Sequence, residues 1–441
     1  MEVSNLIFAL CLGTASFLFG KNVLKVRRNI MLGRDIDRSD RSTERWITMA
    51  RVALGQSKMV VRPVAGFLHI LVYVGFVIIN IEVLEIVIDG LIGTHRVFAF
   101  MGAFYSFLIG SFEILAFLVL LACVLFMIRR NVLQIKRFVM QEMDGWPKLD
   151  ANLILIFEIV LMSAFLLMQG ADLALQGLGA DHYFKAGSFP ISSFLLPLFD
   201  GMSIEAIVMI ERVCWWFHIL GILAFLNYLP YSKHFHIILA FPNTYYSNLE
   251  PKGSFTNMAS VKNEVQMMMD PNADPYAATA EVDDAEDPGR FGAKDVNDLN
   301  WVQLMNAYSC TECGRCTSEC PANQTGKLLS PRKIMMDTRD RLEEFGAHVT
   351  ANGKDGDDGK SLLDDYITRE ELWACTSCNA CTQACPINID PLSIILDMRR
   401  YLVMEESAAP TELNMMFTNV ENNGAPWQFP AVDRLNWKDE A

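Results

Sequence analysis

The chain has 441 residues, of which 52% are hydrophobic, and its formal net charge is −14. This hydrophobic fraction exceeds that of typical soluble domains and indicates a membrane protein. The charge is segregated, with residues 21–62 basic and residues 270–300 acidic, so it reports membrane topology and excludes nucleic acid as an expected partner.

Five apolar segments are long enough to cross a lipid bilayer, which takes about 20 helical residues. The first is followed by Lys21, Lys25 and Arg27 and lacks both a basic n-region and a small-residue cleavage site, so we expect it to be retained rather than removed as a signal peptide. We therefore predict an all-α fold that begins with a five-helix transmembrane bundle over residues 1–246. The expected spans are 3–20, 64–92, 104–128, 151–175 and 213–241.

Basic residues alternate between the loops. Segments 21–62 and 129–150 are rich in Lys and Arg, whereas the other loops have little beyond Arg96, Lys185 and Arg212. By the positive-inside rule, the N-terminus lies outside the cell inner (cytoplasmic) membrane and the C-terminus lies in the cytoplasm.

Composition changes abruptly after the last span. Residues 247–299 are polar, acidic and interrupted by prolines, which is typical of a linker. Helix starts follow at Ser330-Pro331, at Thr368 with Glu371 three residues later, and at Asp390-Pro391. They predict a helical domain over residues 300–405, followed by a tail over 406–441.

The strongest signal is a doubled cysteine motif. Thiolates are soft ligands for iron, and a C-x2-C-x2-C loop can place three sulfurs on three corners of one cubane. Zinc is the alternative for C-x2-C pairs, but zinc motifs lack the third and fourth spacing and the trailing proline. We expect two [4Fe–4S] clusters and, as in two-cluster ferredoxins, a fourth cysteine that crosses to the other cluster. The expected ligand sets are Cys310, Cys313, Cys316 and Cys385 for the first cluster, and Cys375, Cys378, Cys381 and Cys320 for the second.

The stretches AYSCTECGRCTSECPA (307–322) and ELWACTSCNACTQACPI (371–387) resemble the helical two-cluster ferredoxin domain of heterodisulfide reductase subunits and of the anaerobic glycerol-3-phosphate dehydrogenase iron–sulfur subunit. The resemblance implies electron relay. Because the Cys-Cys-Gly motif of the catalytic members does not occur in the chain, the resemblance also implies a separate cytoplasmic partner, either a Cys-Cys-Gly-type iron–sulfur subunit or another redox subunit.

Histidines in membrane spans are candidate axial ligands of haem b. In a continuous fifth helix, His218 and His236 would share one face about 27 Å apart, and His234 would be turned roughly 160° away. A kink at Pro230 would upset this arithmetic. His69 lies early in the second span, near the cytoplasmic face, so we expect it to pair with His236.

This arrangement resembles the haem-binding gamma subunit of respiratory nitrate reductase and the cytochrome b subunit of membrane heterodisulfide reductase. The resemblance implies one or two haem b groups. The nitrate reductase pattern has two histidines on the second span, whereas here only His69 lies within it. His95, just past that span, is the candidate partner for His218, ahead of His182.

Simpler explanations stand beside these assignments. His182 and His234 are at least as well explained as loop or interfacial residues, and the same explanation is an alternative for His95. His218 follows two tryptophans that would suit an aromatic belt.

Four glutamates lie in the predicted spans. Glu113 and Glu158 are candidates for quinone-linked proton transfer, although protonated carboxyls packed between helices would explain them equally well. Glu82 and Glu85 lie near the outer end of their span, where we expect them to be solvated.

These features predict a membrane electron-transfer subunit of a respiratory chain. It would link the quinone pool, menaquinone included, through haem b and two [4Fe–4S] clusters to a cytoplasmic redox partner in a heterodisulfide reductase-like complex. Substrate chemistry would belong to the partner. The alternatives are a non-haem membrane anchor and a redox sensor that carries a ferredoxin domain.

Overall fold

The computed structural model describes residues 3–270, 290–353 and 356–439. Within these ranges the regular structure is helical, and extended pairing is limited to two isolated bridges. The predicted all-α class is confirmed within these ranges, as is the presence of five helices of membrane-spanning length.

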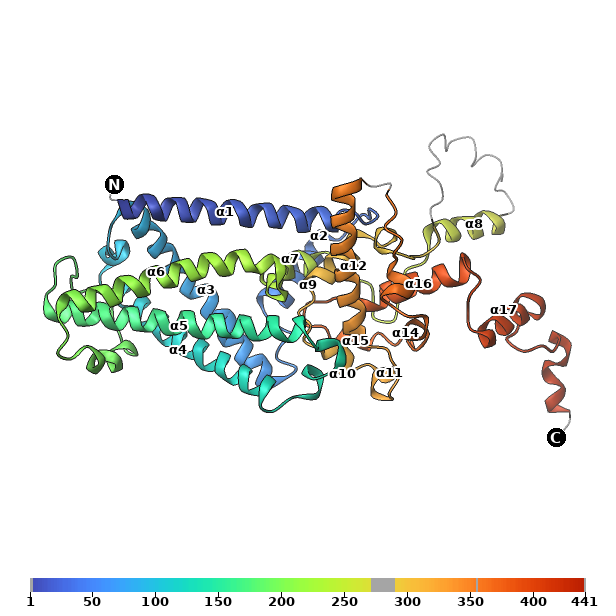
Figure 1. Ribbon diagram of the computed structural model, residues 1–441. Coiled ribbons are helices and arrows are strands. Elements are labelled where there is room, and N and C mark those ends of the chain that lie inside the picture. Colours follow the sequence, from blue (N-terminus) through green and yellow to red (C-terminus); the bar gives the residue numbers. More distant parts are fainter. Residues whose placement is uncertain (1–2, 271–289, 354–355, 440–441) are drawn as a thin grey trace.

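Five long helices lie side by side and form the bundle at one end of the molecule (Figure 1). Within the most apolar window of each candidate span, between 17% and 39% of the residues are buried inside the protein. Apolar side chains therefore cover the outside of the bundle as well as its interior, which is the pattern of helices in contact with lipid. The helices are α1 (Val3–Ile30), α3 (Pro63–Ile92), α4 (Ala103–Asn131), α5 (Trp146–Leu178) and α6 (Ile204–Tyr228).

Glycines allow close approach between these helices. A Cβ atom on Gly90 of α3 would lie 2.7 Å from the ring of Phe8 on α1, and one on Gly75 would overlap Val119 on α4. In lipid, where the hydrophobic effect does not drive helices together, such small-residue contacts supply much of the packing.

The fifth span differs from its prediction. It begins at Ile204 rather than at residue 213, and α6 ends at Tyr228. Two short 3-10 turns, Leu229–Tyr231 and Lys233–Phe235, precede α7 (His236–Tyr245). Pro230 has no N–H to continue the helix, and Ser232 is extended, with its hydroxyl accepting from the His234 N–H at 3.1 Å. The expectation of one continuous helix over 213–241 is therefore wrong.

The C-terminal helices pack around the cysteine loops. The three predicted helix starts are confirmed. Ser330 and Asp390 accept hydrogen bonds from the first turns of their helices, and Thr368 forms a capping box with Glu371. The longer helices are α9 (Trp301–Ser309), α12 (Pro331–Asn352) and α16 (Pro391–Met404), and the shorter ones are α10 (Arg315–Ser318), α11 (Pro321–Gln324), α13 (Leu362–Asp365), α14 (Arg369–Trp373) and α15 (Ala380–Ala384).

The cluster domain docks on the bundle. The amide of Asn29, in the last turn of α1, donates to the Tyr308 hydroxyl at 2.9 Å and lies so close to Gly346 that a Cβ there would overlap it. Beyond α1, the Arg34 N–H donates to Leu299 O at 2.8 Å, and the Trp301 N–H donates to Arg34 O at 3.1 Å. The segment after the first span is thus an interface with the cluster domain as well as a basic loop.

Two further segments complete the fold. α2 (Ser42–Met49) carries Arg45, whose fully buried guanidinium donates to Tyr245 O and Ser247 O at 3.2 and 3.1 Å. Helix α17 (Thr411–Asn423) and the 3-10 segment Ala431–Lys438 extend away from the body (Figure 1).

Part of the predicted linker belongs to the core of the cluster domain. Ala293, Val296 and Leu299 are fully buried, and Arg341 pairs with Asp295 at 2.6 Å. Before that, α8 (Ala259–Met269) is helical, and residues 271–289 lie outside the described residues.

Candidate iron–sulfur and haem sites

The two cysteine motifs meet in space. Cys310, Cys313 and Cys316 of the first motif line one cavity together with Cys385, the fourth cysteine of the second. Cys310 ends α9 and Cys385 ends α15, so two loops converge from different helices. This is the arrangement that the crossover prediction requires.

The cavity suits a metal cluster. Its walls include the apolar side chains of Met335, Ile387 and Ile389. Burial raises the pKa of Cys310 to about 12 and that of Cys385 to about 11, so free thiols here would stay neutral at physiological pH. Bonding to a metal is what deprotonates such thiols.

Cations surround the first motif. Arg315 donates to the Lys58 and Met59 carbonyls at 2.9 and 3.3 Å, and Arg332 donates to Arg137 O at 2.5 Å. Burial lowers the pKa of Lys58 to about 8 and that of Arg137 to about 10. Positive charge next to a bound cluster would favour the reduced form of the cluster, which carries one more negative charge.

The second motif lies nearer the surface. Cys378 is exposed, whereas Cys320 and Cys381 are buried. The pKa of Cys375 is raised by burial and also by the nearby charges of Cys320 and Cys378. Cys320 is thus a neighbour of the second motif, as the second crossover prediction requires.

Arg399 stabilises the loop of the second motif. Arg399 donates to Leu372 O at 2.9 Å and to Cys375 O at 2.5 Å, and its guanidinium lies 4.9 Å from the centre of the Trp373 ring. The Ser377 N–H donates to the Cys375 sulfur at 3.4 Å. This loop is fixed by local contacts within the cluster domain.

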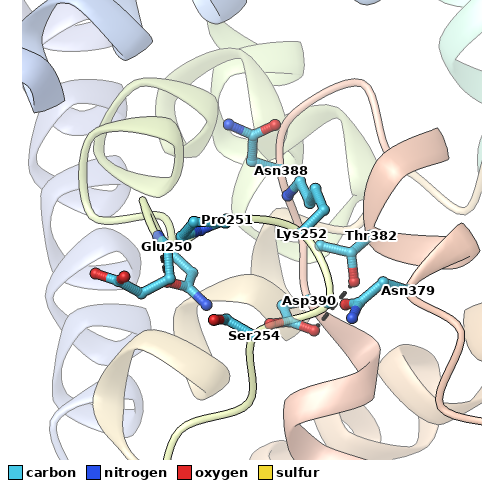
Figure 2. Close-up of a pocket in the computed structure, with 10 residues that line it drawn as sticks. Glu250, Pro251, Lys252, Ser254, Asn379, Thr382, Asn388 and Asp390 are labelled. Atoms are coloured by element: carbon cyan, nitrogen blue, oxygen red, sulfur yellow. Dashed lines mark hydrogen bonds between the residues drawn. The ribbon is translucent and has the colours of Figure 1, made fainter.

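A polar pocket flanks the second motif (Figure 2). The segment from Glu250 to Ser254 faces Asn379, Thr382 and Asp390 across it, and the Thr382 hydroxyl donates to Asp390 at 3.1 Å. This segment, which follows the last membrane helices, covers one side of the second cysteine loop.

Three histidines gather at the cluster end of the bundle. The rings of His69 and His236 have centres 6.5 Å apart, and those of His234 and His236 have centres 5.5 Å apart. The helical-face argument is therefore wrong for this segment, because the break at 229–235 brings His234 against His236. Burial lowers the pKa of His234 to about 3 and also lowers that of His236, which keeps both rings neutral.

The ring centres of His69 and His236 are about as far apart as those of two imidazoles bound to one metal ion. Two imidazoles bonded at about 2 Å on opposite sides of one metal ion have ring centres roughly 6 Å apart. The Nδ1 of His236 bonds to Lys233 O at 3.0 Å, which leaves Nε2 for a metal, and the buried Nδ1 of His69 has no partner among the described residues. A histidine ligand usually bonds a carbonyl through its other nitrogen in this way.

His218 lies deeper in the bundle. Its side chain is buried, its Nδ1 bonds to Leu161 O at 3.0 Å, and its ring lies 5.7 Å from that of Phe165. His95 is instead next to Asp172 (3.4 Å between Nε2 and Oδ2) and Tyr183 (5.0 Å between ring centres).

The other sequence candidates fall into place around this pair. His182 is an exposed loop residue. Trp215, which precedes His218, packs on Phe8 inside the bundle rather than in an outer belt. The structure thus brings neither His95 nor His182 to His218.

The candidate carboxyl groups have different surroundings. Glu113 is buried and accepts from the Ile191 and Ser192 N–H groups at 2.9 and 3.2 Å, while Glu158 is half-buried. The expectation that Glu82 and Glu85 are solvated is wrong, because they are 3% and 4% exposed. The sequence signal for their burial was Arg96, a charged residue close after an apolar span that could pair with them.

Contacts connect the histidine pair to the first cysteine motif. Lys233, whose carbonyl holds His236, forms an ion pair with Glu312, which lies between Cys310 and Cys313. Arg339 holds the other carboxyl oxygen of Glu312 at 2.7 Å.

A second connection runs through Arg315, next to Cys316. Arg315 bonds to Met59 O, and Gly66, one turn before His69, packs closely on the same carbonyl group. Both histidines are thus connected to the first motif through a short series of direct contacts.

Comparison with known proteins places the chain. Residues 309–389 match a family described as "4Fe-4S dicluster domain". The chain is 30% identical to the "Probable iron-sulfur-binding oxidoreductase FadF" of Bacillus subtilis, over 99% of this chain and 61% of that protein. It is 27% identical to the "EtfAB:quinone oxidoreductase" of Syntrophomonas wolfei, over 92% of this chain and 55% of that protein. The chain thus spans little more than half the length of these relatives.

Other relatives match a smaller part of the chain. The chain is 32% identical to one of the subunits of a CoB-CoM heterodisulfide reductase of Methanosarcina acetivorans, over 24% of this chain and 52% of that protein. No solved structure matches the chain. The resemblance to heterodisulfide reductase subunits is confirmed: the chain is a membrane-anchored iron–sulfur protein in which a [4Fe–4S] dicluster domain is fused to helices of membrane-spanning length.

Proposed function

We propose that this chain carries electrons between the membrane quinone pool and a cytoplasmic redox partner, through haem b and two [4Fe–4S] clusters. The observation that carries the proposal is the closeness of the His69 and His236 pair to the first cysteine cavity, through Lys233 with Glu312 and through Arg315 with Met59. The name of the Syntrophomonas relative, a quinone oxidoreductase, supports quinone as the membrane substrate.

The residues would divide the work as follows. His69 and His236 would hold a haem, which when bound supplies a one-electron centre within the bundle. His218 would hold a second haem. Lys233 fixes the ring of His236 and, through Glu312, the loop of the first motif. The eight motif cysteines would hold the two clusters in the crossed sets predicted from their spacing.

The order of the relay follows from burial. The first cavity lies against the bundle among cations, whereas the second motif has an exposed cysteine, Cys378. Electrons would therefore pass between quinone and haem, then the first cluster, then the second, and leave near Cys378. The partner would be an iron–sulfur subunit of the Cys-Cys-Gly type or another redox protein in a heterodisulfide reductase-like complex.

We also propose the topology and the domain limits. The basic segments 21–62 and 129–150 lie at the cluster end of the bundle, which supports a cytoplasmic cluster domain and an N-terminus outside. The proposed units are the bundle (1–246), the linker (247–299), whose last residues join the core of the cluster domain, the cluster domain itself (300–405) and the tail (406–441).

Proteoliposomes test the function. With all cofactors loaded, a menaquinol analogue should reduce haem and clusters, followed by visible absorption and by electron paramagnetic resonance (EPR). Chemically reduced protein should in turn be oxidised by the quinone. The matched variant His69→Ala should keep both clusters and lose quinol-driven cluster reduction.

Two outcomes would contradict the proposal. Failure of exchange in both directions with every cofactor present would show that quinone is not the substrate. Full exchange in protein that lacks a b-type spectrum would favour the non-haem anchor.

A further inference from the structure

A buried network of polar and charged side chains lies at the end of the bundle opposite the cluster domain. This end is marked by the start of α1, where the Asn5 amide donates to Gly90 O at 2.8 Å, whereas the far end of α1 docks on the cluster domain. The network joins α3, α4, α5 and the loop after α3. Its fully or nearly fully buried members are Glu82, Glu85, Arg96, Tyr105, Gln169 and Asp172.

Arg96 is the centre of this network. It donates to Asp172 at 2.7 Å, to the Tyr105 hydroxyl at 3.0 Å and to the Gln169 side-chain oxygen at 2.5 Å. The Gln169 amide in turn donates to Glu82. The Gln169 side chain is therefore fixed from both sides.

The carboxyl groups differ in how many donors they have. Both oxygens of Glu85 are bonded, to the Phe98 N–H at 2.8 Å and to the Tyr105 hydroxyl at 2.9 Å. Glu82 receives only the Gln169 amide, and its buried Oε2 has no hydrogen-bond partner among the described residues. A carboxylate with few donors is the one that burial neutralises most readily.

Asp172 is better satisfied. Besides Arg96, it accepts from the Gln176 amide at 3.0 Å, and His95, whose side chain is 22% exposed, lies 3.4 Å away. Glu113 also faces Glu82 and Arg96 from α4, with one oxygen held by two backbone N–H groups and the other without a partner in the described part of the chain.

The charges do not balance. Glu82, Glu85 and Asp172 contribute three carboxyl groups, Glu113 faces them as a fourth, and among the described residues Arg96 is the one guanidinium bonded into this network. If all four were ionised they would carry three excess negative charges, a state so costly in a low dielectric that at least one proton is retained. Glu82 accepts one hydrogen bond, whereas Glu113 accepts two from backbone N–H groups, so the hydrogen-bond pattern selects Glu82.

We infer that Glu82 is the buried proton-carrying residue of the membrane bundle, and that Asp172 and His95 connect it to the surface at this end. Arg96 and Gln169 hold the carboxyl groups in place and do not titrate, so the inference requires a water-mediated step between Glu82 and Asp172. The Glu82 oxygen that Gln169 does not hold is the point of exchange with the interior.

The redox region is close by. Gln169 follows Phe165, the residue in contact with His218, by one helical turn of about 6 Å. The inference rests on the proposed quinone function in one respect, which is the source of the protons. A quinol that is oxidised gives up two electrons and two protons. The electrons leave singly toward the clusters, and Glu82 passes the protons singly toward Asp172, being reloaded by the quinol each time. Quinone reduction runs the same steps backwards.

Infrared difference spectroscopy of the complete, cofactor-loaded protein tests this, with reduction driven by an electrode so that no quinone is needed. Wild type should show a protonated-carboxyl C=O band that changes with redox state and shifts in D2O. Glu82→Gln should lose that band, and Glu82→Asp should restore it at a shifted position. The matched control is Glu211→Gln, which removes a buried carboxyl at the same end, paired with Arg212 and Tyr183. It should keep the band.

Proton release in proteoliposomes supplies the second readout. Glu82→Gln should slow quinol-driven proton release at least tenfold while cluster content and melting temperature stay as in wild type. A band that persists in Glu82→Gln, or unchanged proton release in that variant, overturns the role of Glu82 and leaves the quinone function standing. If the wild-type protein does not exchange electrons with quinone but keeps the infrared band, the quinone function is overturned and the role of Glu82 stands.

Discussion

The two cysteine motifs have the same spacing and different surroundings. The first lies against the membrane bundle, where Arg137, Arg315 and Arg332 approach it from three segments of the chain. The second has Arg399, from its own domain, as a neighbour and includes an exposed cysteine. Nearby charge and burial set the potential of an iron–sulfur cluster, so two identical ligand patterns can hold clusters of different potential. In the proposed relay, the first cluster would be the inner electron carrier, next to the bundle, and the second would be the outer one.

The largest expected effect comes from breaking the crossed ligand sets. Cys385→Ser should remove the cluster at the first cavity and leave the other, because its sulfur lies with the first motif. Cys320→Ser should do the reverse. In each case about half of roughly eight iron atoms per chain should be lost, as measured by iron analysis and EPR of the reduced protein.

A result in the opposite sense would refute the crossed assignment. Cys123→Ser is the control, since this buried thiol of α4 lies outside both motifs. It should keep both clusters.

The second prediction concerns the haem proposed at His69 and His236. His69→Ala and His236→Ala should abolish the same b-type absorption, because either change removes one of two facing rings. His234→Ala should retain it. If His234→Ala removes the signal and His236→Ala does not, the pair is wrongly assigned.

Removing one neighbouring charge should change the reduction potential of one cluster and leave that of the other unchanged. Arg315→Gln should lower the potential of the first cluster by roughly 50 mV, about 1 kcal/mol for one electron, and leave the second unchanged. Arg399→Gln should act on the second alone. Redox titration followed by EPR measures both. Equal shifts at both clusters in either variant would mean that their surroundings are not electrostatically distinct.

The smallest predicted effect is on folding stability, and both clusters should respond to it equally. Burial raises the pKa of Asp337 on α12 to about 6, although Lys333 lies 2.7 Å away. A carboxyl whose pKa is higher in the folded state binds more protons there, so folding stability falls as pH rises from about 4 to about 6. Asp337→Asn should remove that fall and stabilise the domain by about 1 kcal/mol at pH 7. The two clusters should bleach together on heating, at a higher temperature than in wild type. An unchanged melting temperature at pH 7 would contradict this.

Local signals were read correctly from the sequence, and long-range ones were not. The caps at Ser330, Thr368 and Asp390 depend on three or four consecutive residues, and the cysteine spacing encodes its own chemistry. The break at Leu229–Phe235 was anticipated only as a kink at Pro230, because the extended Ser232 is stabilised by the distant Asp150, which accepts from its hydroxyl at 2.6 Å. The position of His234 therefore had to come from the structure.

The buried glutamates teach the same lesson. Position along a span suggested solvation for Glu82 and Glu85, and only the contacts of Arg96, Gln169 and Tyr105 show why they are buried instead. Linear distance from the end of a helix does not report what a neighbouring loop brings over it.

The docking of the cluster domain on α1 bears on whether the domain would move during the proposed electron transfer. Asn29 seated against Gly346, with the backbone pairing of Arg34 on either side of Asn300, prevents the domain from swinging toward and away from the membrane. Carriers that swing deliver electrons at a rate set by diffusion, and their turnover slows in a viscous medium. Here the gap between the His69 and His236 pair and the first cavity is built into the fold. Internal electron transfer should therefore proceed as quickly in glycerol as in dilute buffer.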